Sequence, residues 1–174
     1  VVSPVSIDPA SLTALAHERA TQVLVERLRA RVSSRRLIVG VDRIDSTKAI
    51  PQRIEAIDRA FRSGIFHPDE VEIVQIAQPS RTSLTVSREL RLQIERRAHD
   101  VAANWLRSDG TAALRVSTEG CDRRQVAALF TAADMALVTP RRDGMNLVAK
   151  EFSILNEPRS GALVLARGAG AADD

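Results

Sequence analysis

The sequence has few of the residues on which several common classes of protein depend. Cys121 is the single cysteine, so no disulfide can form within the chain, and such usage is typical of a cytoplasmic protein. The three histidines, His17, His67 and His99, are scattered without the spacing of metal ligands. No apolar run approaches the roughly 20 residues that a membrane span needs. We therefore expect a cytoplasmic protein with no metal site and no membrane partner.

Lysine and aromatic residues are also scarce. Lys48 and Lys150 are the only lysines among 25 basic residues, and aromatic residues make up 3% of the chain. Neither a glycine-rich dinucleotide fingerprint, nor a Walker A sequence, nor a G-x-S-x-G elbow is present. The net charge of +3 would suit a nucleic acid, but the basic residues are mixed with acidic ones and lack interleaved aromatic rings. We therefore expect no nucleic-acid partner.

The pattern of apolar residues predicts one α/β domain over the 174 residues. The expected strands span residues 36–41, 71–77, 112–116, 135–138 and 162–165. The expected helices span residues 9–32, a segment that opens at Pro51, 86–108, a segment capped by Asp122, and 147–156. Strands that alternate with helices form a parallel sheet with right-handed crossovers. The prediction is a Rossmann-like parallel sheet with helices on both faces.

Polar loops follow three of the expected strands. In such sheets, ligands bind beyond the carboxyl ends of the strands, which meet at one edge. Basic residues on three loops at that edge indicate a phosphorylated ligand. The polar residues of these loops are Arg43, Asp45, Lys48, Ser80, Arg81, Arg142, Asp143 and Asn146.

The stretch 138–151 predicts a strand, a tight polar loop and a helix. Gly144 allows a sharp turn and a close approach to a ligand. The following helix would present unpaired N–H groups and a partial positive charge, which suit a phosphate or a sugar hydroxyl network. In the alternative interpretation, Asp143 is only an N-cap that accepts from the Asn146 N–H, and the neighbouring arginines at 141 and 142 are solvated.

Arg43 and Lys48 lie five residues apart on a loop that can direct both cations to one diphosphate. In the alternative interpretation, Arg43 pairs with Asp45 or Asp42, and Lys48 is solvated.

Two further charged residues could either bind a ligand or be exposed to solvent. Arg81 could bind a second anion or be a solvated loop arginine. Glu151 could accept from ribose hydroxyls or be an exposed helix acid.

The polar motifs resemble those of the trehalose-6-phosphate synthases in order and spacing. The motifs are residues 41–48, 75–81 and 137–151, and residues 161–165 and 168–172 continue the resemblance. The resemblance covers nearly the whole chain and is to the C-terminal, nucleotide-sugar-binding half of these enzymes. It implies that residues 1–174 form one Rossmann-like half of a glycosyltransferase B fold, with the N-terminal acceptor domain and the final helices outside this sequence.

The resemblance implies transfer of glucose from a nucleoside diphosphate glucose to glucose 6-phosphate. UDP-glucose is the expected donor, the product is α,α-trehalose 6-phosphate, and the reaction retains configuration without a metal or other cofactor. Arg43 and Lys48 would hold the donor diphosphate, and Asp143 would hold the donor sugar; these are the expected catalytic residues. The leaving phosphate would accept the proton of the acceptor.

The resemblance also implies further contacts to the two substrates. Glu151 would bind the ribose, and Arg81 would contact the acceptor phosphate. Backbone N–H groups and two apolar side chains would complete the donor site: Gly144, Met145, Asn146, Leu147 and Val148.

Some positions differ from the family pattern. Ala49 replaces a glycine usual after Lys48, Ser46 stands where an aromatic residue is common, and Gly120-Cys121 replaces a bulkier pair near the base. These differences leave the nucleobase open, together with two alternatives: a non-catalytic regulatory paralogue, or a related transferase acting on a cyclitol or another sugar phosphate. Homo-oligomerisation is also left open. We expect the 174-residue chain alone to bind nucleotide weakly and not to turn over.

Overall fold

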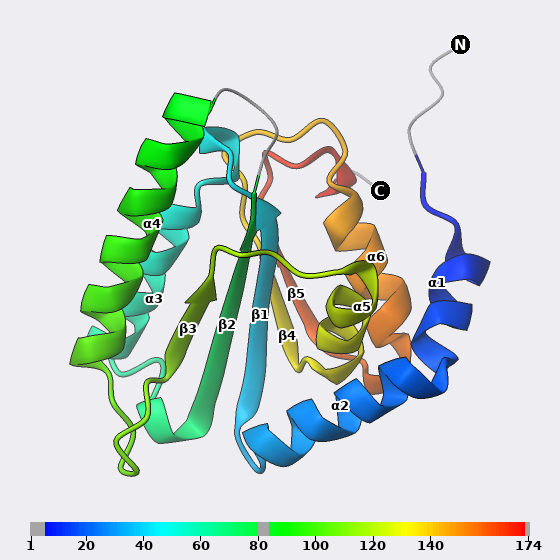
Figure 1. The fold of residues 1–174 in the computed structure, drawn as a ribbon, viewed down its shortest axis with the longest axis horizontal. Coiled ribbons are helices and arrows are strands. Elements are labelled where there is room, and N and C mark those ends of the chain that lie inside the picture. Colours follow the sequence, from blue (N-terminus) through cyan, green and yellow to red (C-terminus); the bar gives the residue numbers. More distant parts are fainter. Residues whose placement is uncertain (1–5, 80–83, 173–174) are drawn as a thin grey trace.

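The computed structural model describes residues 6–79 and 84–172, with the backbone alone for residues 84–87. Its centre is a five-stranded sheet with the order β3-β2-β1-β4-β5, in which all neighbouring strands are parallel (Figure 1). The strands are β1 (Arg36–Arg43), β2 (Val71–Gln78), β3 (Leu114–Ser117), β4 (Met135–Val138) and β5 (Ala162–Leu165). All five predicted strands are confirmed, with small shifts at their ends.

Helices cover both faces of this sheet (Figure 1). α3 and α4 pack on one face, while α1, α2, α5 and α6 pack on the other, so the structure has two apolar cores separated by the strands. The predicted α/β architecture is therefore confirmed. The α-helices are α1 (Pro9–His17), α2 (Arg19–Val32), α3 (Ile50–Arg62), α4 (Leu84–Asn104), α5 (Arg123–Ala132) and α6 (Leu147–Asn156). The 3-10 helices are η1 (Ser46–Lys48), η2 (Pro68–Glu70), η3 (Glu157–Arg159) and η4 (Gly170–Ala172).

The first predicted helix is wrong in one respect, because it is two helices. Glu18 has an extended backbone, with φ −56° and ψ 135°, and it separates α1 from α2. The helical spacing of apolar residues continues across this break, so the sequence pattern gives no sign of it. The bend lets α1 pack against α5 and α6 while α2 packs against α5.

The predicted helix 86–108 ends earlier, at Asn104. The next residues form a turn in which Arg107 donates to the carbonyl oxygens of Ala112 and Val71, at 2.7 and 2.9 Å. Arg107 is buried, which a helix continuing into solvent would not allow. In the part of the chain that the structure describes, no helix has the length and apolar character needed to cross a membrane.

Candidate functional site

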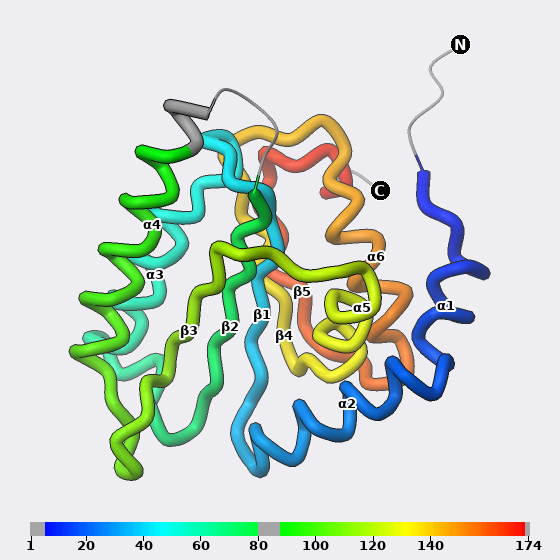
Figure 2. The backbone as a smooth tube through the Cα atoms, in the orientation of Figure 1, coloured from blue at the N-terminus to red at the C-terminus, as the bar shows by residue number. Residues whose placement is uncertain are grey.

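The polar loops begin at the carboxyl edge of the sheet. The loops after β1 and β4 and the segment after β5 lie together at one end of the molecule, in cyan, orange and red (Figure 2). The Arg141 N–H donates to the Thr47 carbonyl oxygen at 2.8 Å, which joins the loop after β4 to the loop after β1. These loops therefore form one site. Arg81, predicted for the loop after β2, lies outside the described residues, so its role stays a prediction.

The loop after β1 is a short 3-10 turn that positions Lys48. Asp45 caps this turn by accepting from the backbone N–H and the hydroxyl of Thr47, both at 2.8 Å. These hydrogen bonds hold the pKa of Asp45 below its ordinary value, and the charges of Arg43 and Lys48 add to the effect. Ala49 follows in the left-handed region, with φ 54° and ψ 34°. A side chain costs energy there, which is a physical reason for the glycine usual at this position in the resembled family.

Lys48 and Asp143 form an ion pair that connects the two loops. The Lys48 ammonium donates to Oδ2 of Asp143, and the two side chains are 12% and 18% exposed. The same oxygen accepts from Nδ2 of Asn146 at 2.9 Å. The alternative of a solvated Lys48 is therefore wrong. Charges shielded in this way interact more strongly than a surface pair.

The amino end of α6 presents unpaired backbone donors. Asn146, with φ 65°, is the N-cap, and its Oδ1 accepts from the Ala149 N–H at 3.0 Å. The alternative in which Asp143 is only this N-cap is therefore wrong. Among the described residues, the N–H groups of Gly144, Met145 and Asn146 have no acceptor. Three free donors at the positive end of a helix suit an anion or sugar hydroxyls.

The segment after β5 holds this loop in place. The N–H groups of Gly170 and Ala171 donate to the carbonyl oxygens of Asp143 and Met145, at 3.1 and 2.8 Å. A Cβ at Gly170 would lie 2.1 Å from the Gly144 carbonyl oxygen, so only glycine allows this approach. The position of the Asp143 loop therefore depends on residues 168–172.

Arg43 lies exposed at the end of β1 and forms no ion pair with any described residue. Asp42 pairs with an arginine of α3, and Asp45 accepts from its own turn. The alternative in which Arg43 pairs with Asp42 or Asp45 is therefore wrong, and its guanidinium can reach a ligand. Arg141 and Arg142 are exposed, as solvated loop charges would be.

A buried network beneath the site involves Arg53 of α3, for which the sequence predicted no role. Its guanidinium donates to Thr139 Oγ1 at 2.8 Å, Asp42 Oδ2 at 2.5 Å and Gln75 Oε1 at 2.8 Å. Thr139 directly follows β4, Asp42 lies near the carboxyl end of β1, and Gln75 lies in the middle of β2. A Cβ at Gly40 would lie 2.3 Å from Gln75 Oε1, so glycine leaves room for the network. Gly40, a glycine inside an apolar strand, is the sequence signal that could have pointed to this network.

Burial has the largest effect on the pKa of Asp42 in this network. It raises the pKa of Asp42, while the charge and hydrogen bond of Arg53 oppose the shift. Oδ1 of Asp42 and Nη2 of Arg53 are buried and have no partner among the described residues. The ion pair is therefore incompletely satisfied and depends on both members.

Glu151 lies on α6 and is half-buried, so the alternative of an exposed acid is wrong. Burial raises the pKa of Glu151, and the charge of Arg123 opposes this shift. Glu151 has no hydrogen bond to any described residue, so its carboxylate is free to accept from a ligand. Met145, Leu147 and Val148 are half-buried at the start of the same helix.

The comparisons with known proteins agree with this geometry. The sequence profile of glycosyltransferase family 20 matches residues 1–174. The chain belongs to this family. It is 39% identical to the trehalose-6-phosphate synthase of Mycolicibacterium gilvum over 170 residues, which are 97% of this chain and 34% of that relative. The chain thus spans about a third of the length of the relatives that it matches.

Solved structures from the same family have the same fold as the chain. An α,α-trehalose-phosphate synthase (UDP-forming) from Burkholderia xenovorans in complex with glucose-6-phosphate matches with a TM-score of 0.89 and 34% identity, over 99% of this chain and 38% of that chain. The trehalose-6-phosphate enzyme of E. coli bound with UDP-2-fluoro glucose matches with a TM-score of 0.89 and 32% identity, over the same shares. The predicted family and the predicted fold class, a Rossmann-like half of a glycosyltransferase B fold, are confirmed. The roles of individual residues stay predictions.

Proposed function

We propose that residues 1–174 form the C-terminal donor-binding domain of a retaining glycosyltransferase. It transfers glucose from a nucleoside diphosphate glucose, with UDP-glucose as the expected donor, to glucose 6-phosphate without a metal ion. The product is α,α-trehalose 6-phosphate. One observation carries the proposal: the Lys48–Asp143 pair joins two loops beside three backbone N–H groups that lack acceptors among the described residues.

The cations of the loop after β1 suit the donor diphosphate. Arg43 is exposed and unpaired among the described residues, while Lys48 is nearly buried at the junction of the loops. A guanidinium provides a fork of donors, and an ammonium provides a compact charge. Together they offset the charge that develops on a leaving nucleoside diphosphate. The transfer itself moves the anomeric carbon from the diphosphate oxygen to the acceptor hydroxyl, and the leaving phosphate takes the hydroxyl proton.

The sugar would lie against Asp143 and the start of α6. A carboxylate accepts from hydroxyl groups, and the N–H groups of residues 144–146 donate to oxygens. Without ligand, Asp143 is engaged by Lys48 and Asn146. Lys48 has three N–H donors, so it can add a phosphate oxygen while Asp143 turns to the sugar.

The protein groups that would bind the acceptor, which form the second half of the site, lie outside the described residues. Arg81 is proposed as a contact to the acceptor phosphate, together with groups from an N-terminal domain that this sequence does not contain. The relatives are about three times as long as the segment that they share with this chain. We therefore expect no steady release of UDP when this chain alone meets both substrates.

The direct test is calorimetric titration of the 174-residue chain with UDP-glucose, UDP, GDP and ADP. We expect weak, saturable binding of UDP-glucose and UDP. Lys48→Gln should abolish the binding, whereas Arg36→Gln, which removes an exposed positive charge at the opposite end of β1, should leave it unchanged. Equal binding of all three nucleotides would contradict recognition of the base, and binding that survives Lys48→Gln would contradict the site.

The binding of UDP-glucose should weaken as the pH falls. Glu151 has a raised pKa, so its carboxylate takes up a proton at a higher pH than an exposed glutamate does. The protonated form accepts fewer hydrogen bonds from ribose hydroxyls. We expect the affinity for UDP-glucose to be lower at pH 5 than at pH 7.5.

UDP-glucose is the right probe because both of its phosphates are esterified and do not titrate in this range. Glu151→Gln should bind UDP-glucose with little change over the same interval. An identical pH profile in both proteins would refute the role of Glu151.

A further inference from the structure

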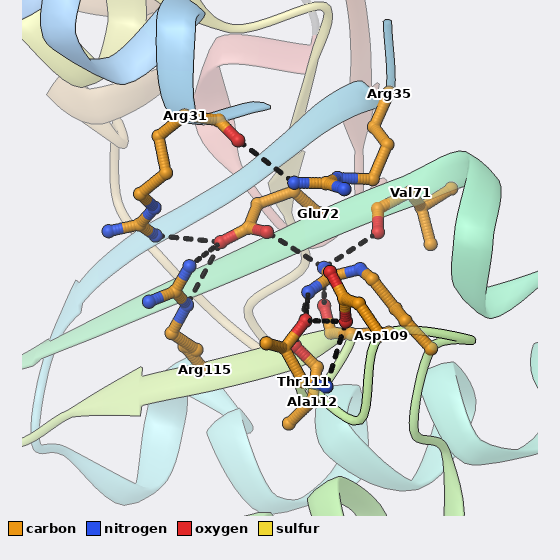
Figure 3. Close-up of polar contacts among 10 residues, drawn as sticks. Arg31, Arg35, Val71, Glu72, Asp109, Thr111, Ala112 and Arg115 are labelled. Carbon is orange, nitrogen blue, oxygen red and sulfur yellow. Dashed lines mark hydrogen bonds and ion pairs between the residues drawn. The ribbon is translucent and has the colours of Figure 1, made fainter. Parts of the chain in front are cut away.

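A second cluster of charged residues lies around Glu72, near the amino end of β2. The Glu72 side chain has an exposure of 0% and forms ion pairs with arginines from three separate segments of the chain. Arg31 of α2 and Arg115 of β3 approach the same carboxylate oxygen (Figure 3). Arg107 donates to the other oxygen at 2.7 Å. A single buried carboxylate therefore holds three guanidinium groups.

The carboxylate has more donors than it needs. Oε1 accepts from Nη2 of Arg31 at 2.7 Å and from Nε and Nη2 of Arg115 at 2.9 and 2.5 Å. A carboxylate oxygen offers about two lone-pair positions, so three N–H groups compete for this atom. One of these donors can turn to another acceptor without leaving Glu72 unpaired.

The cluster also has an excess of positive charge. Arg35 lies beside it and donates to the Arg31 carbonyl oxygen at 2.8 Å (Figure 3). Asp109, whose charge acts on Arg107, is the second acid of the cluster. Four guanidinium groups thus face two carboxylates. Nε of Arg35 and Nε of Arg107 are buried without an acceptor among the described residues.

The cluster is open to solvent on the side of its two outer arginines. The side chains of Arg31 and Arg115 are each 47% exposed. A hollow of about 310 Å³ between α2, α5 and β2 adjoins Arg31; it is lined mostly by apolar side chains, with Arg27 and Arg31 among its polar residues, and does not include Arg115. Because both outer side chains are about half exposed, a small anion can reach both guanidinium groups from solvent.

We propose that Arg31 and Arg115 form a binding site for a phosphate group, either free phosphate or a phosphate ester. Glu72 holds the two guanidinium groups side by side, and Arg107 offsets the charge of Glu72. A guanidinium fork matches the oxygens of a phosphate, and an anion between two like charges relieves their repulsion. The site lies six residues along β2 from Gln78, about 20 Å from the donor edge, so it is separate from the proposed function.

The test uses the 174-residue chain and inorganic phosphate at constant ionic strength, adjusted with chloride. Arg43→Gln/Lys48→Gln removes the cations of the donor site, so that any remaining site is seen alone. We expect one phosphate per chain by calorimetry. In ¹⁵N spectra of the unsubstituted chain, the Nε–H signals of Arg31 and Arg115 should shift.

Arg31→Gln in the same background should weaken phosphate binding at least tenfold, while Arg36→Gln should change it less than twofold. Arg31→Gln leaves Arg107 and Arg115 on Glu72, and the spectra of the unsubstituted chain do not depend on any variant folding. A titration with glucose 6-phosphate distinguishes two kinds of site. A site for phosphate esters binds glucose 6-phosphate as well as inorganic phosphate, and a site for free phosphate binds inorganic phosphate alone; either result supports the proposal. Unsaturable binding, unmoved Arg31 and Arg115 signals, or equal effects of Arg31→Gln and Arg36→Gln would overturn it.

Discussion

Arg53→Met should lower the free energy of unfolding by about 3–5 kcal/mol at pH 7, the usual cost of removing one member of a buried ion pair. Methionine fills much of the space of the arginine stem, so a cavity adds little to this cost. The main loss is electrostatic, because Asp42 would stay buried without its guanidinium partner. Gln75 and Thr139 would also lose a donor. Urea unfolding followed by circular dichroism measures the change.

The pH dependence distinguishes this cause from lost packing. Burial already holds the pKa of folded Asp42 above its ordinary value, and removing Arg53 raises it further. Between the unfolded and the folded pKa, the folded state binds more protons, so folding stability falls as the pH rises through this window. The deficit of Arg53→Met should therefore be smaller at pH 5 than at pH 7.

Two variants serve as controls for this prediction. Asp42→Asn/Arg53→Met removes the unpaired charge and should recover much of the lost stability at pH 7. Arg59→Met changes an exposed arginine of the same helix and should alter stability by less than about 0.5 kcal/mol. A deficit that is independent of pH and is not relieved in the double variant would mean that packing, not charge, explains the effect.

The sequence predicted the sheet better than the ends of its helices. Short apolar runs with long helical segments between them have few topologies available, because parallel crossovers are right-handed and buried strands need cover on both faces. The break at Glu18 was missed because its position lies within a continuous helical pattern. The early end of α4 was missed because Arg107, an arginine near the end of a helix, gives no sign of its burial.

The loops of the site were predicted, but the contacts between them were not. The motifs placed Lys48 and Asp143 at one edge, and the structure brings their side chains together. Spacing along the chain gives no information on a pair 95 residues apart. Arg53 and Glu72 were missed for a related reason: each is a charged residue whose burial depends on partners from distant elements.

Lys48→Ala should cost about 2–4 kcal/mol in transition-state stabilisation, by analogy with the loss of an electrostatic donor in other enzymes. This corresponds to a loss of roughly 30-fold to 1,000-fold in kcat/KM. The measurement needs a full-length enzyme that contains this segment, with UDP release followed at saturating and limiting UDP-glucose. The effect should be large because Lys48 lies at the junction of two loops and is shielded from water, where a charge on the leaving diphosphate is poorly screened.

The Lys48–Asp143 ion pair leads to a second expectation, in which one substitution strengthens the binding of UDP and lowers activity. This combination identifies the role of Lys48 more firmly than a loss of activity can. Asp143→Asn releases Lys48 from its carboxylate partner, so UDP alone should bind more tightly while glucosyl transfer falls. Lys48→Arg should recover only part of the activity, since a planar guanidinium does not replace a compact ammonium in a tight site. If Lys48→Ala left kcat/KM unchanged, or if Asp143→Asn weakened the binding of UDP, Lys48 could not be the group that holds the diphosphate. Stabilisation of the charge on the leaving group would then depend on Arg43 and the N–H groups at the start of α6 alone.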